Sequence, residues 1–323
     1  MRASERLRAG VIGLGHLGRY HAQKYSALPD VELVTLYDSD RRRAAAVASE
    51  LRCEVAEDAD DLVSRVDLAS IAVPTAFHLA VGLQALRSGV HVLMEKPLAA
   101  SVDEGRRIVE AADTAGVVLQ VGHLERFNPV FKDIRRVIGR PRFMECHRLA
   151  PFAGRGSDTD VVFDVMIHDL DLIDYLVGAS LERVEAVGVP VLSDKIDIAN
   201  ARLIFDGGCT ANVTASRVSL KRERKMRVFQ EDAYVSIDFD SGKALVARKS
   251  RRRGAAEVGN PMDAIEAEEK ELGGGDPLME QLAAFVSCVR GGSRPLIGGP
   301  EGLRALALAD RVVKAIPDFG PGG

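Results

Sequence analysis

The run DVMIHDLDLIDYLV, which begins at Asp164, combines helical spacing with side chains that can carry out acid–base chemistry. Asp164, His168, Asp171 and Tyr175 recur at intervals of three and four residues, so they fall on one side of a helix. An ordinary solvated face would carry Lys and Arg, but neither occurs between residues 155 and 183. The apolar side chains repeat on the opposite side: Met166, Leu170, Ile173 and Val177. The pattern raises the hypothesis that the polar side of the helix faces an active site.

His168 is the candidate general base for a substrate hydroxyl group, because the unperturbed pKa of histidine lies near neutrality. Asp164, four residues earlier, could orient the imidazole or pass its proton outward. Asp171 could do the same or hold the helix in place, and the acids could also be plain solvated charges. No metal is expected, since such a site needs a third ligand that neither His123 nor His147 is clearly placed to supply.

A second reactive side chain follows a short apolar run. Glu95, Lys96 and Pro97 come directly after VHVLM, which is typical of a buried strand. Ligands of open α/β sheets bind beyond the carboxyl ends of the strands. Lys96 would then face the nicotinamide of a bound dinucleotide; a surface lysine in an exposed turn is the alternative.

A glycine motif gives this sheet its ligand. Gly13, Gly15 and Gly18 form GxGxxG directly after the apolar run that starts the chain's folded part, and Asp38 follows twenty residues later at the end of a second run. The glycines allow a tight turn, close approach of a pyrophosphate and helix–strand packing, and the acid suits a ribose 2′-hydroxyl group. NAD is therefore the expected cofactor. Arginines at 41–43 leave some use of NADP open.

The elements needed to position these residues form two different patterns. Up to residue 124, strand-like runs (7–15, 31–38, 67–74, 90–97 and 117–122) alternate with helical segments, which indicates an α/β domain with a parallel sheet and helices on both faces. After a helix that starts at Asn128 and Pro129, strands dominate: 143–149, 183–189, 198–205, 210–216, 226–231, 234–239 and 243–249. Turns at DGG and DSG favour hairpins. The second domain, 125–323, is expected to be α+β with an open, mostly antiparallel sheet, and it ends in two helices, near 278–289 and 301–315.

Composition limits the classes of protein. The 323 residues carry 43 basic and 47 acidic side chains, a net charge of −4 that gives no reason to expect nucleic acid as a partner. Apolar runs are too short to span a membrane, and the start of the chain lacks the apolar core of a signal peptide. The four cysteines lack metal-ligand spacing, so a reducing cytoplasm is expected. The linker-like stretch from Arg251 to Pro277 is predicted to contain a strand at AIEAEEKEL.

Taken together, the ordered motifs resemble the Gfo/Idh/MocA family of NAD(P)-dependent oxidoreductases over nearly the whole chain. The motifs are GVIGLGHLGRYHA, AVPTAFH, EKPLA, ERFNP and DVMIHDLDL. The resemblance implies an N-terminal Rossmann domain, 1–124, and a C-terminal substrate and oligomerisation domain. It implies that Lys96 and His168 are catalytic and that Asp164 relays the proton. It further implies cofactor contacts from the three glycines, Asp38 and the following residues: His16, Leu17, Pro74, Thr75, His78, Glu95 and Lys96.

The pairing of GHLERFNP with FDVMIHDLDL is similar to the UDP-N-acetylglucosamine 3-dehydrogenases. Where many family members have glycine two residues before the histidine, this chain has Met166. The predicted function is NAD-dependent oxidation of C3 of a UDP-amino sugar, with Lys96, Asp164, His168, Arg126 and Asn128 contacting the substrate. For Arg126, a structural salt bridge is an equal alternative. Oxidation of a free polyol or monosaccharide such as an inositol stays open, and a non-catalytic NAD-binding regulator is less favoured because Lys96 and His168 are both present.

The resemblance also bears on assembly. The strands of the second half alternate apolar and polar residues, so a sheet with helices on one side must cover its other face or leave it wet. Relatives with this architecture pack that face against a second subunit. A homodimer or homotetramer built on the C-terminal sheet is therefore expected.

Overall fold

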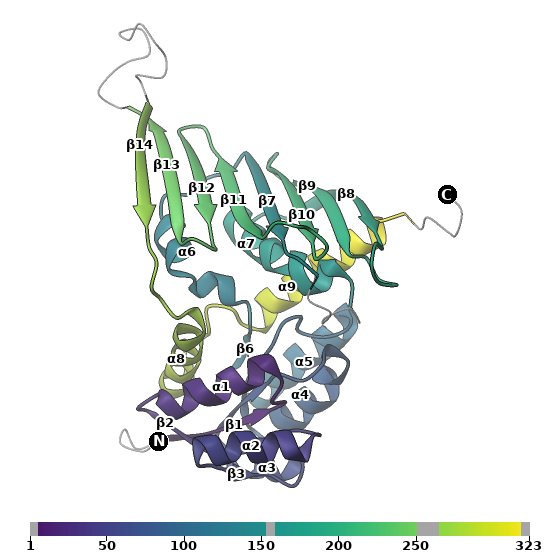
Figure 1. Cartoon of the computed structure of the whole chain (residues 1–323), viewed down its shortest axis with the longest axis vertical. Helices are drawn as coiled ribbons and strands as arrows, with labels where there is room; N and C mark the ends of the chain where they lie inside the picture. The colour runs from purple at the N-terminus through teal and green to yellow at the C-terminus, as the bar shows by residue number, and fades with distance from the viewer. Residues whose placement is uncertain (1–5, 153–158, 251–264, 318–323) are drawn as a thin grey trace, which may run out of the picture. The chain divides into compact units, whose positions relative to one another are not determined.

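The computed structural model describes residues 6–152, 159–250 and 265–317. The chain forms two compact units, Met1–Leu124 with Asp276–Ala307, and Glu125–Gly275 with Leu308–Gly323 (Figure 1). The division predicted from the sequence placed everything after residue 124 in the second domain. The segment Asp276–Ala307 instead belongs to the first unit, because α8 (Pro277–Gly291) buries Leu282, Phe285 and Val286 in its core.

The first unit is a doubly wound parallel sheet. Its strands are β1 (Leu7–Ile12), β2 (Val31–Tyr37), β3 (Glu54–Val55), β4 (Leu68–Ile71), β5 (His91–Met94) and β6 (Leu119–Val121). Its other helices are α1 (His16–Ala27), α2 (Arg41–Leu51), α3 (Ala59–Arg65), η1 (Thr75–Phe77), α4 (His78–Arg87), α5 (Val102–Ala115) and the first part of α9 (Gly299–Ala315). The strand order β3-β2-β1-β4-β5-β6, parallel throughout, is that of a dinucleotide-binding fold. The predicted Rossmann fold is confirmed.

Local sequence explains these elements. Strand β4 is buried at all four positions, as expected for a parallel sheet covered on both faces. Ser101 caps α5 by accepting a hydrogen bond from the backbone N–H of Glu104, as its capping sequence predicts. The helix ends at Gly116, which has a left-handed φ of 66°. Both ends of α5 are therefore encoded in the local sequence.

The second unit is an eight-stranded open sheet. Its strands are β7 (Phe143–Leu149), β8 (Leu181–Val189), β9 (Ile198–Phe205), β10 (Thr210–Ser216), β11 (Glu223–Phe229), β12 (Ala233–Asp238), β13 (Lys243–Lys249) and β14 (Ile265–Glu271). Its helical segments are η2 (Leu124–Phe127), α6 (Pro129–Ile134), the π-helical turn η3 (Val162–Met166), α7 (Ile167–Val177) and the end of α9. The order is β14-β13-β12-β11-β7-β10-β9-β8, antiparallel except for the parallel pair β7 and β10. The predicted mostly antiparallel sheet is confirmed, and β14 lies within the predicted AIEAEEKEL. Residues 251–264, the first part of the linker-like stretch from Arg251 to Pro277, lie outside the described residues.

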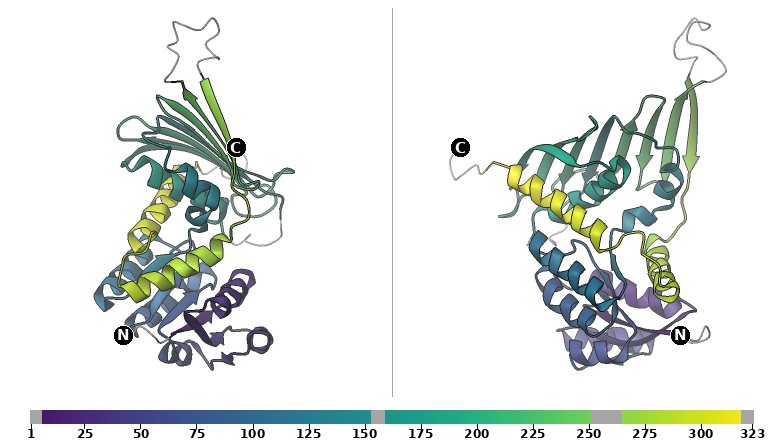
Figure 2. Two further views of the ribbon diagram at one scale, coloured as in Figure 1. Left: turned by 90° about the vertical axis from the view of Figure 1, so that its left-hand side faces the viewer. Right: turned by 180° about the vertical axis from the view of Figure 1, so that it is seen from behind.

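The two faces of this sheet differ. On one face, Met144, Val213 and Val235 are buried. This is the face covered by helices, including α6 and α7 (Figure 2). On the other, Phe143, Phe229 and Tyr234 from three neighbouring strands pack together, with ring centroids 5.5 Å and 4.9 Å apart. Phe229 is 37% exposed. An aromatic cluster thus lies on the open face.

Candidate active site

The glycine turn between β1 and α1 allows two close backbone contacts. Gly13 has φ 86°, and a Cβ atom there would lie 2.6 Å from the carbonyl oxygen of Ala72. A Cβ atom at Gly18 would lie 1.8 Å from the carbonyl oxygen of Gly13. A larger residue at Gly13 would displace the segment after β4, and a larger residue at Gly18 would push α1 away from the glycine turn. Around Gly15, by contrast, a Cβ atom would meet nothing within 4 Å, so the backbone is open to a ligand.

The start of α1 suits an anion. Gly15 is the N-cap residue and supplies no side-chain hydrogen bond, and the first turn holds no acidic residue. Backbone N–H groups at such an end, together with the helix dipole, favour a phosphate. His16 and Leu17, the first residues of the helix, are exposed beside it. The residues present therefore fit the pyrophosphate of NAD.

Asp38 lies at the end of β2, where the sequence placed it. Its carboxylate is buried and accepts hydrogen bonds from the backbone N–H groups of Leu14 (2.7 Å) and Asp40 (2.8 Å). Arg43, half exposed, forms an ion pair with it at 3.1 Å. The bond to Leu14 ties the acid to the glycine turn, which is the position expected for the residue that binds the adenosine ribose of a dinucleotide.

Both ring nitrogens of His78, for which the resemblance implied a cofactor contact, lie close to backbone carbonyl groups. The ring is buried, with Nδ1 2.9 Å from the carbonyl oxygen of Pro97 and Nε2 3.0 Å from that of Val73. Burial lowers its pKa, although these carbonyl groups act in the opposite direction. His78 thus ties the loop after β4, which carries Pro74 and Thr75, to the loop after β5.

Glu95 and Lys96 follow β5 at its carboxyl end, and the Lys96–Pro97 bond is cis. Lys96 is half-buried. Glu95 is 8% exposed, and its Oε1 lies 3.0 Å from Nε2 of His21 on α1. Burial raises the pKa of Glu95, but the hydrogen bond and charge of His21 and the charge of Lys96 lower it by more, so the carboxyl group titrates below its usual range. His21 was missed by the sequence analysis, although it lies within the quoted GVIGLGHLGRYHA motif.

The catalytic candidates of the second unit lie on η3 and α7. Asp164 is in the π-helical turn, and His168 is in the first turn of α7; both are half-buried. Single π-helical turns inside helices occur often at functional sites. The N–H groups of Phe163 and Asp164 donate to the carbonyl group of Asp160, which starts the turn. The sequence predicted the helix but gave no sign of the widened turn.

The other members of the polar line have structural partners. Both carboxylate oxygens of Asp171 accept hydrogen bonds from Arg126, at 2.6 Å and 2.8 Å, and both residues are buried. The Arg126 guanidinium group also lies 4.6 Å from the centre of the Tyr175 ring. Arg126 therefore forms a structural salt bridge, one of the two sequence alternatives, in which Nε and Nη2 both donate to Asp171 on α7.

A second buried ion-pair group holds the same helix. Arg148 on β7 donates to Asp169 at 2.8 Å and to Glu125 at 2.7 Å. Burial lowers the pKa of Arg148, but the two acids raise it by more. Asn128, predicted to contact substrate, uses both ends of its amide locally: its oxygen caps α6 and its nitrogen donates to Glu125. The ERFNP motif thus holds α7 in place, through the bond of Arg126 to Asp171 and through Arg148, which Glu125 shares with Asp169.

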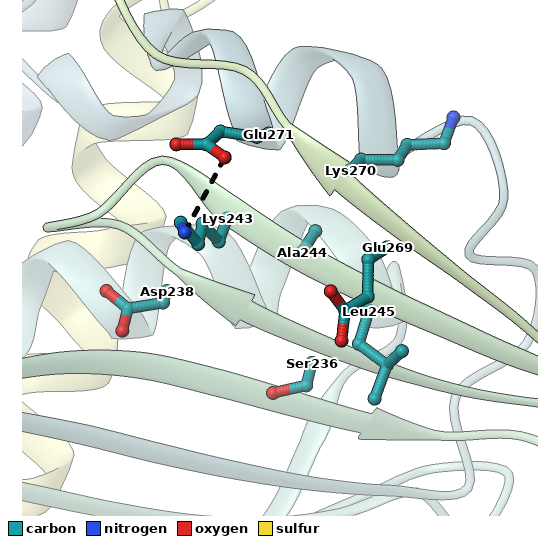
Figure 3. A pocket seen from close by; sticks show the side chains of 8 residues that line it. All are labelled: Ser236, Asp238, Lys243, Ala244, Leu245, Glu269, Lys270 and Glu271. Atoms are coloured by element: carbon teal, nitrogen blue, oxygen red, sulfur yellow. Dashed lines mark ion pairs between the residues drawn. The ribbon is translucent and has the colours of Figure 1, made fainter.

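Two hollows lie away from these residues. One, of 410 Å³, is on β12, β13 and β14, where the Lys243–Glu271 ion pair spans 3.5 Å (Figure 3). The other, of 630 Å³, is in the first unit near His91 and Arg304. Neither contains a predicted site residue. Among the described residues, no group of three His, Cys, Asp or Glu side chains could hold a metal ion, and no helix is long and apolar enough to cross a membrane.

The glycine turn, Asp38 and the Rossmann sheet define the class: an NAD-dependent oxidoreductase. Comparison with known proteins agrees. Residues 7–123 match the model of an oxidoreductase family with an NAD-binding Rossmann fold, and residues 135–236 match the GFO/IDH/MocA C-terminal domain. The chain belongs to the Gfo/Idh/MocA family.

Individual relatives cover almost the full chain. It is 39% identical, over 97% of its length and 98% of the relative, to UDP-N-acetylglucosamine 3-dehydrogenase of Acidithiobacillus ferrooxidans. A solved structure of that enzyme gives a TM-score of 0.89 with 97% of this chain and 99% of that chain covered. The scyllo-inositol 2-dehydrogenase (NAD(+)) of Bacillus subtilis is 28% identical over 90% of this chain and 88% of the relative.

Proposed function

We propose that this protein oxidises the C3 hydroxyl group of UDP-N-acetylglucosamine to a ketone, with NAD as the oxidant. The observation that carries the proposal is the similarity to the UDP-N-acetylglucosamine 3-dehydrogenase of Acidithiobacillus ferrooxidans, which is 39% identical over nearly the full length of both chains. The shared family and the sequence motifs around Lys96 and His168 support the same reaction class.

Three side chains take part in the proposed reaction. His168 accepts the proton of the C3 hydroxyl group, and Asp164 orients the imidazole and takes the proton onward. Lys96 donates a hydrogen bond to the same oxygen and stabilises the negative charge that develops as the carbon loses its hydride. Bound NAD supplies the hydride acceptor. The products are the 3-keto nucleotide sugar, the reduced cofactor and one proton.

The test is a direct assay. The protein is incubated with NAD and UDP-N-acetylglucosamine, with hydroxylamine present to trap the ketone, and the absorbance of NADH is followed. Reduction of the untrapped product with borodeuteride, followed by mass spectrometry and NMR, should place deuterium at C3. Absence of NADH formation, or label at another carbon, contradicts the proposal.

A free polyol is the second candidate substrate, favoured by the similarity to an inositol dehydrogenase. Parallel assays with scyllo-inositol and myo-inositol separate the two. If kcat/KM for an inositol exceeds that for the nucleotide sugar, the second candidate replaces the first.

We further propose that the enzyme is cytoplasmic and works as a homodimer or homotetramer joined through the open face of the C-terminal sheet. The packed Phe143, Phe229 and Tyr234 side chains, of which Phe229 is exposed, support an interface there, because aromatic groups are favoured in contacts between proteins.

A further inference from the structure

Arg217, directly after β10, holds the residue that precedes the start of the π-helical turn η3. Its side chain is buried, and its Nη1 atom donates to the carbonyl oxygen of Thr159 at 2.7 Å. The next residue, Asp160, starts the turn, because its carbonyl oxygen accepts the N–H groups of Phe163 and Asp164 at 3.0 Å and 3.1 Å. One buried guanidinium group therefore fixes the backbone from which the turn carrying Asp164 begins.

The guanidinium group is itself held from two further sides. Its Nε atom donates to Oδ1 of Asp197 at 2.7 Å, and its Nη2 atom donates to Oγ of Ser193 at 3.2 Å. The backbone N–H group of Arg217 also donates to the carbonyl oxygen of Asp197, at 3.0 Å. Because the donors of an arginine form a rigid planar fork, these acceptors fix the position of the donor to Thr159.

The loop that contains Asp197 also bonds directly to the start of the turn. The N–H group of Ile196 donates to Oδ1 of Asp160 at 3.0 Å, and its carbonyl oxygen accepts the N–H group of Val161 at 2.8 Å. Ile196 adjoins Asp197, so the acid that holds Arg217 also sets the place of these two bonds. Residues 159–161 are thus fixed at three points by one hydrogen-bonded group centred on Arg217.

The form of the turn decides where its side chains lie. The N–H group of Ile167 donates to the carbonyl oxygen of Val162, five residues earlier, whereas an α-helix uses a partner four residues earlier. Such π-helical turns are rare and occur often at functional sites. The extra residue changes the angle at which Asp164 stands relative to His168. A return of the turn to the α-helical form would therefore rotate the carboxylate relative to the imidazole.

We propose that Arg217 is a positioning residue for the reaction: it keeps the turn before α7 in its π form, and this form places Asp164 where it can orient His168. The inference rests on the proposed function for the roles of those two side chains, but it does not depend on which sugar is oxidised. Arg217 acts through the turn and not through contact with the substrate.

The first experiment measures turnover of the intact protein with saturating NAD and the best sugar substrate. Arg217→Lys keeps the charge but replaces the fork by one nitrogen atom, and Arg217→Met removes the donors altogether. The kcat should fall by about tenfold in the first and about a hundredfold in the second, as a small misplacement of catalytic groups can cause. The Kd for NAD should stay at the wild-type value, because the glycine turn and Asp38 lie in the first unit.

Arg183→Lys is the matched control, since Arg183 is an exposed arginine of the same unit, and it should keep the wild-type kcat. If Arg217→Met does not fold, Arg217→Lys carries the test. A folded Arg217→Lys variant with wild-type kcat would overturn the proposal.

A double-mutant cycle separates positioning from a general loss of structure. In an Asp164→Ala background the placement of the carboxylate no longer matters, so adding Arg217→Lys should lower kcat further by less than about twofold. A purely structural role would lower kcat by the same factor in both backgrounds. That additive result would refute the positioning role.

Hydrogen–deuterium exchange followed by mass spectrometry examines the turn without any substrate. Amide groups of residues 160–167 should exchange faster in Arg217→Lys than in the wild type, whereas those of α5 should exchange at the same rate in both. Unchanged exchange at 160–167 would show that Arg217 does not hold the turn. A wild-type protein that oxidises no sugar would contradict the proposed function instead, so the two failures are distinguishable.

Discussion

Asp38 shapes the glycine turn, and we expect the same side chain to select the cofactor. Its hydrogen bonds to Leu14 and Asp40 fix the carboxylate beside the glycine turn. Arg43 partly neutralises it from the solvent side. We expect the acid to disfavour the 2′-phosphate of NADP and the arginine to weaken that effect.

Two substitutions separate these contributions. Asp38→Ser should relax the preference for NAD over NADP by about tenfold or more, because it removes a charge next to the extra phosphate. Arg43→Ala should sharpen the preference, because it removes the opposing charge. The measurement is kcat/KM with each cofactor. A wild-type protein that prefers NADP would show that Asp38 has been misread.

Lys96 and His168 carry the chemical step in the proposed mechanism. Lys96→Ala and His168→Ala should each lower kcat by about two orders of magnitude or more, the range that acid–base and oxyanion terms supply. The Kd for NAD should change little in His168→Ala, which tests chemistry apart from cofactor binding. Full turnover in either variant excludes the assigned role.

At the scale of elements, α7 shows what the sequence could and could not predict. The spacing of apolar residues predicted the helix, and the unusual run without Lys or Arg marked it as a special segment. The division of this helix into one polar and one apolar side was too simple, because the structure buries both Asp169 and Asp171. Their partners Arg148 and Arg126 lie 21 and 45 residues away in the chain, and no local pattern reveals such a pairing.

The ion pairs behind α7 should matter strongly for stability. Arg148→Met leaves Asp169 and Glu125 without their shared cation in a buried site, which should cost about 3–5 kcal/mol of unfolding free energy. Urea unfolding followed by circular dichroism gives the value. Arg183→Met is the control, because Arg183 is exposed and pairs only weakly with Glu185 at 3.4 Å. Equal stability of the two variants would contradict the role given to Arg148.

The conformation of the loop before β9 depends on the hydrogen bonds of one buried acid, Asp197. The Oδ2 atom of Asp197 accepts the N–H groups of Val191, Leu192 and Ser193, at 2.8, 2.6 and 2.9 Å, and Arg217 donates to Oδ1 at 2.7 Å. Burial raises the pKa of Asp197, but these donors lower it by more, to well below its usual range. Its ionised form therefore stabilises the fold above the pKa of the unfolded chain.

Acidification should remove that stabilisation. Asp197→Asn should unfold more easily than wild type at neutral pH by about 2–4 kcal/mol. The gap should shrink by up to about 1.4 kcal/mol per pH unit once the pH falls below about 4, because the unfolded wild type then takes up a proton that the folded form resists. Urea unfolding at several pH values checks this, and a gap that stays constant or grows toward acid would contradict it.

At the scale of the whole molecule, the sequence predicted the two kinds of sheet but not the return of the chain to the first unit. The strands of both units follow from local runs and turns, and the fold class follows from their alternation. The place of α8 depends on Leu282 and Phe285 filling the core around Leu7 and Leu93, far earlier in the chain. An amphipathic helix carries no mark of which core it completes, so this feature required the structure.

The open face of the C-terminal sheet leads to the prediction on assembly. The Phe143, Phe229 and Tyr234 cluster leaves Phe229 37% exposed, and a self-complementary contact with a second copy would cover it. Multi-angle light scattering at micromolar concentration should give a mass at least twice that of the 34.8 kDa chain.

Phe229→Arg places a charge within the cluster and should shift the protein toward monomer without changing its fold. Leu220→Arg, at a fully exposed position in the turn before β11, should leave the mass unchanged. A wild-type protein that elutes as a clean monomer, or a Phe229→Arg variant that assembles as well as the control, would place the interface elsewhere or remove it.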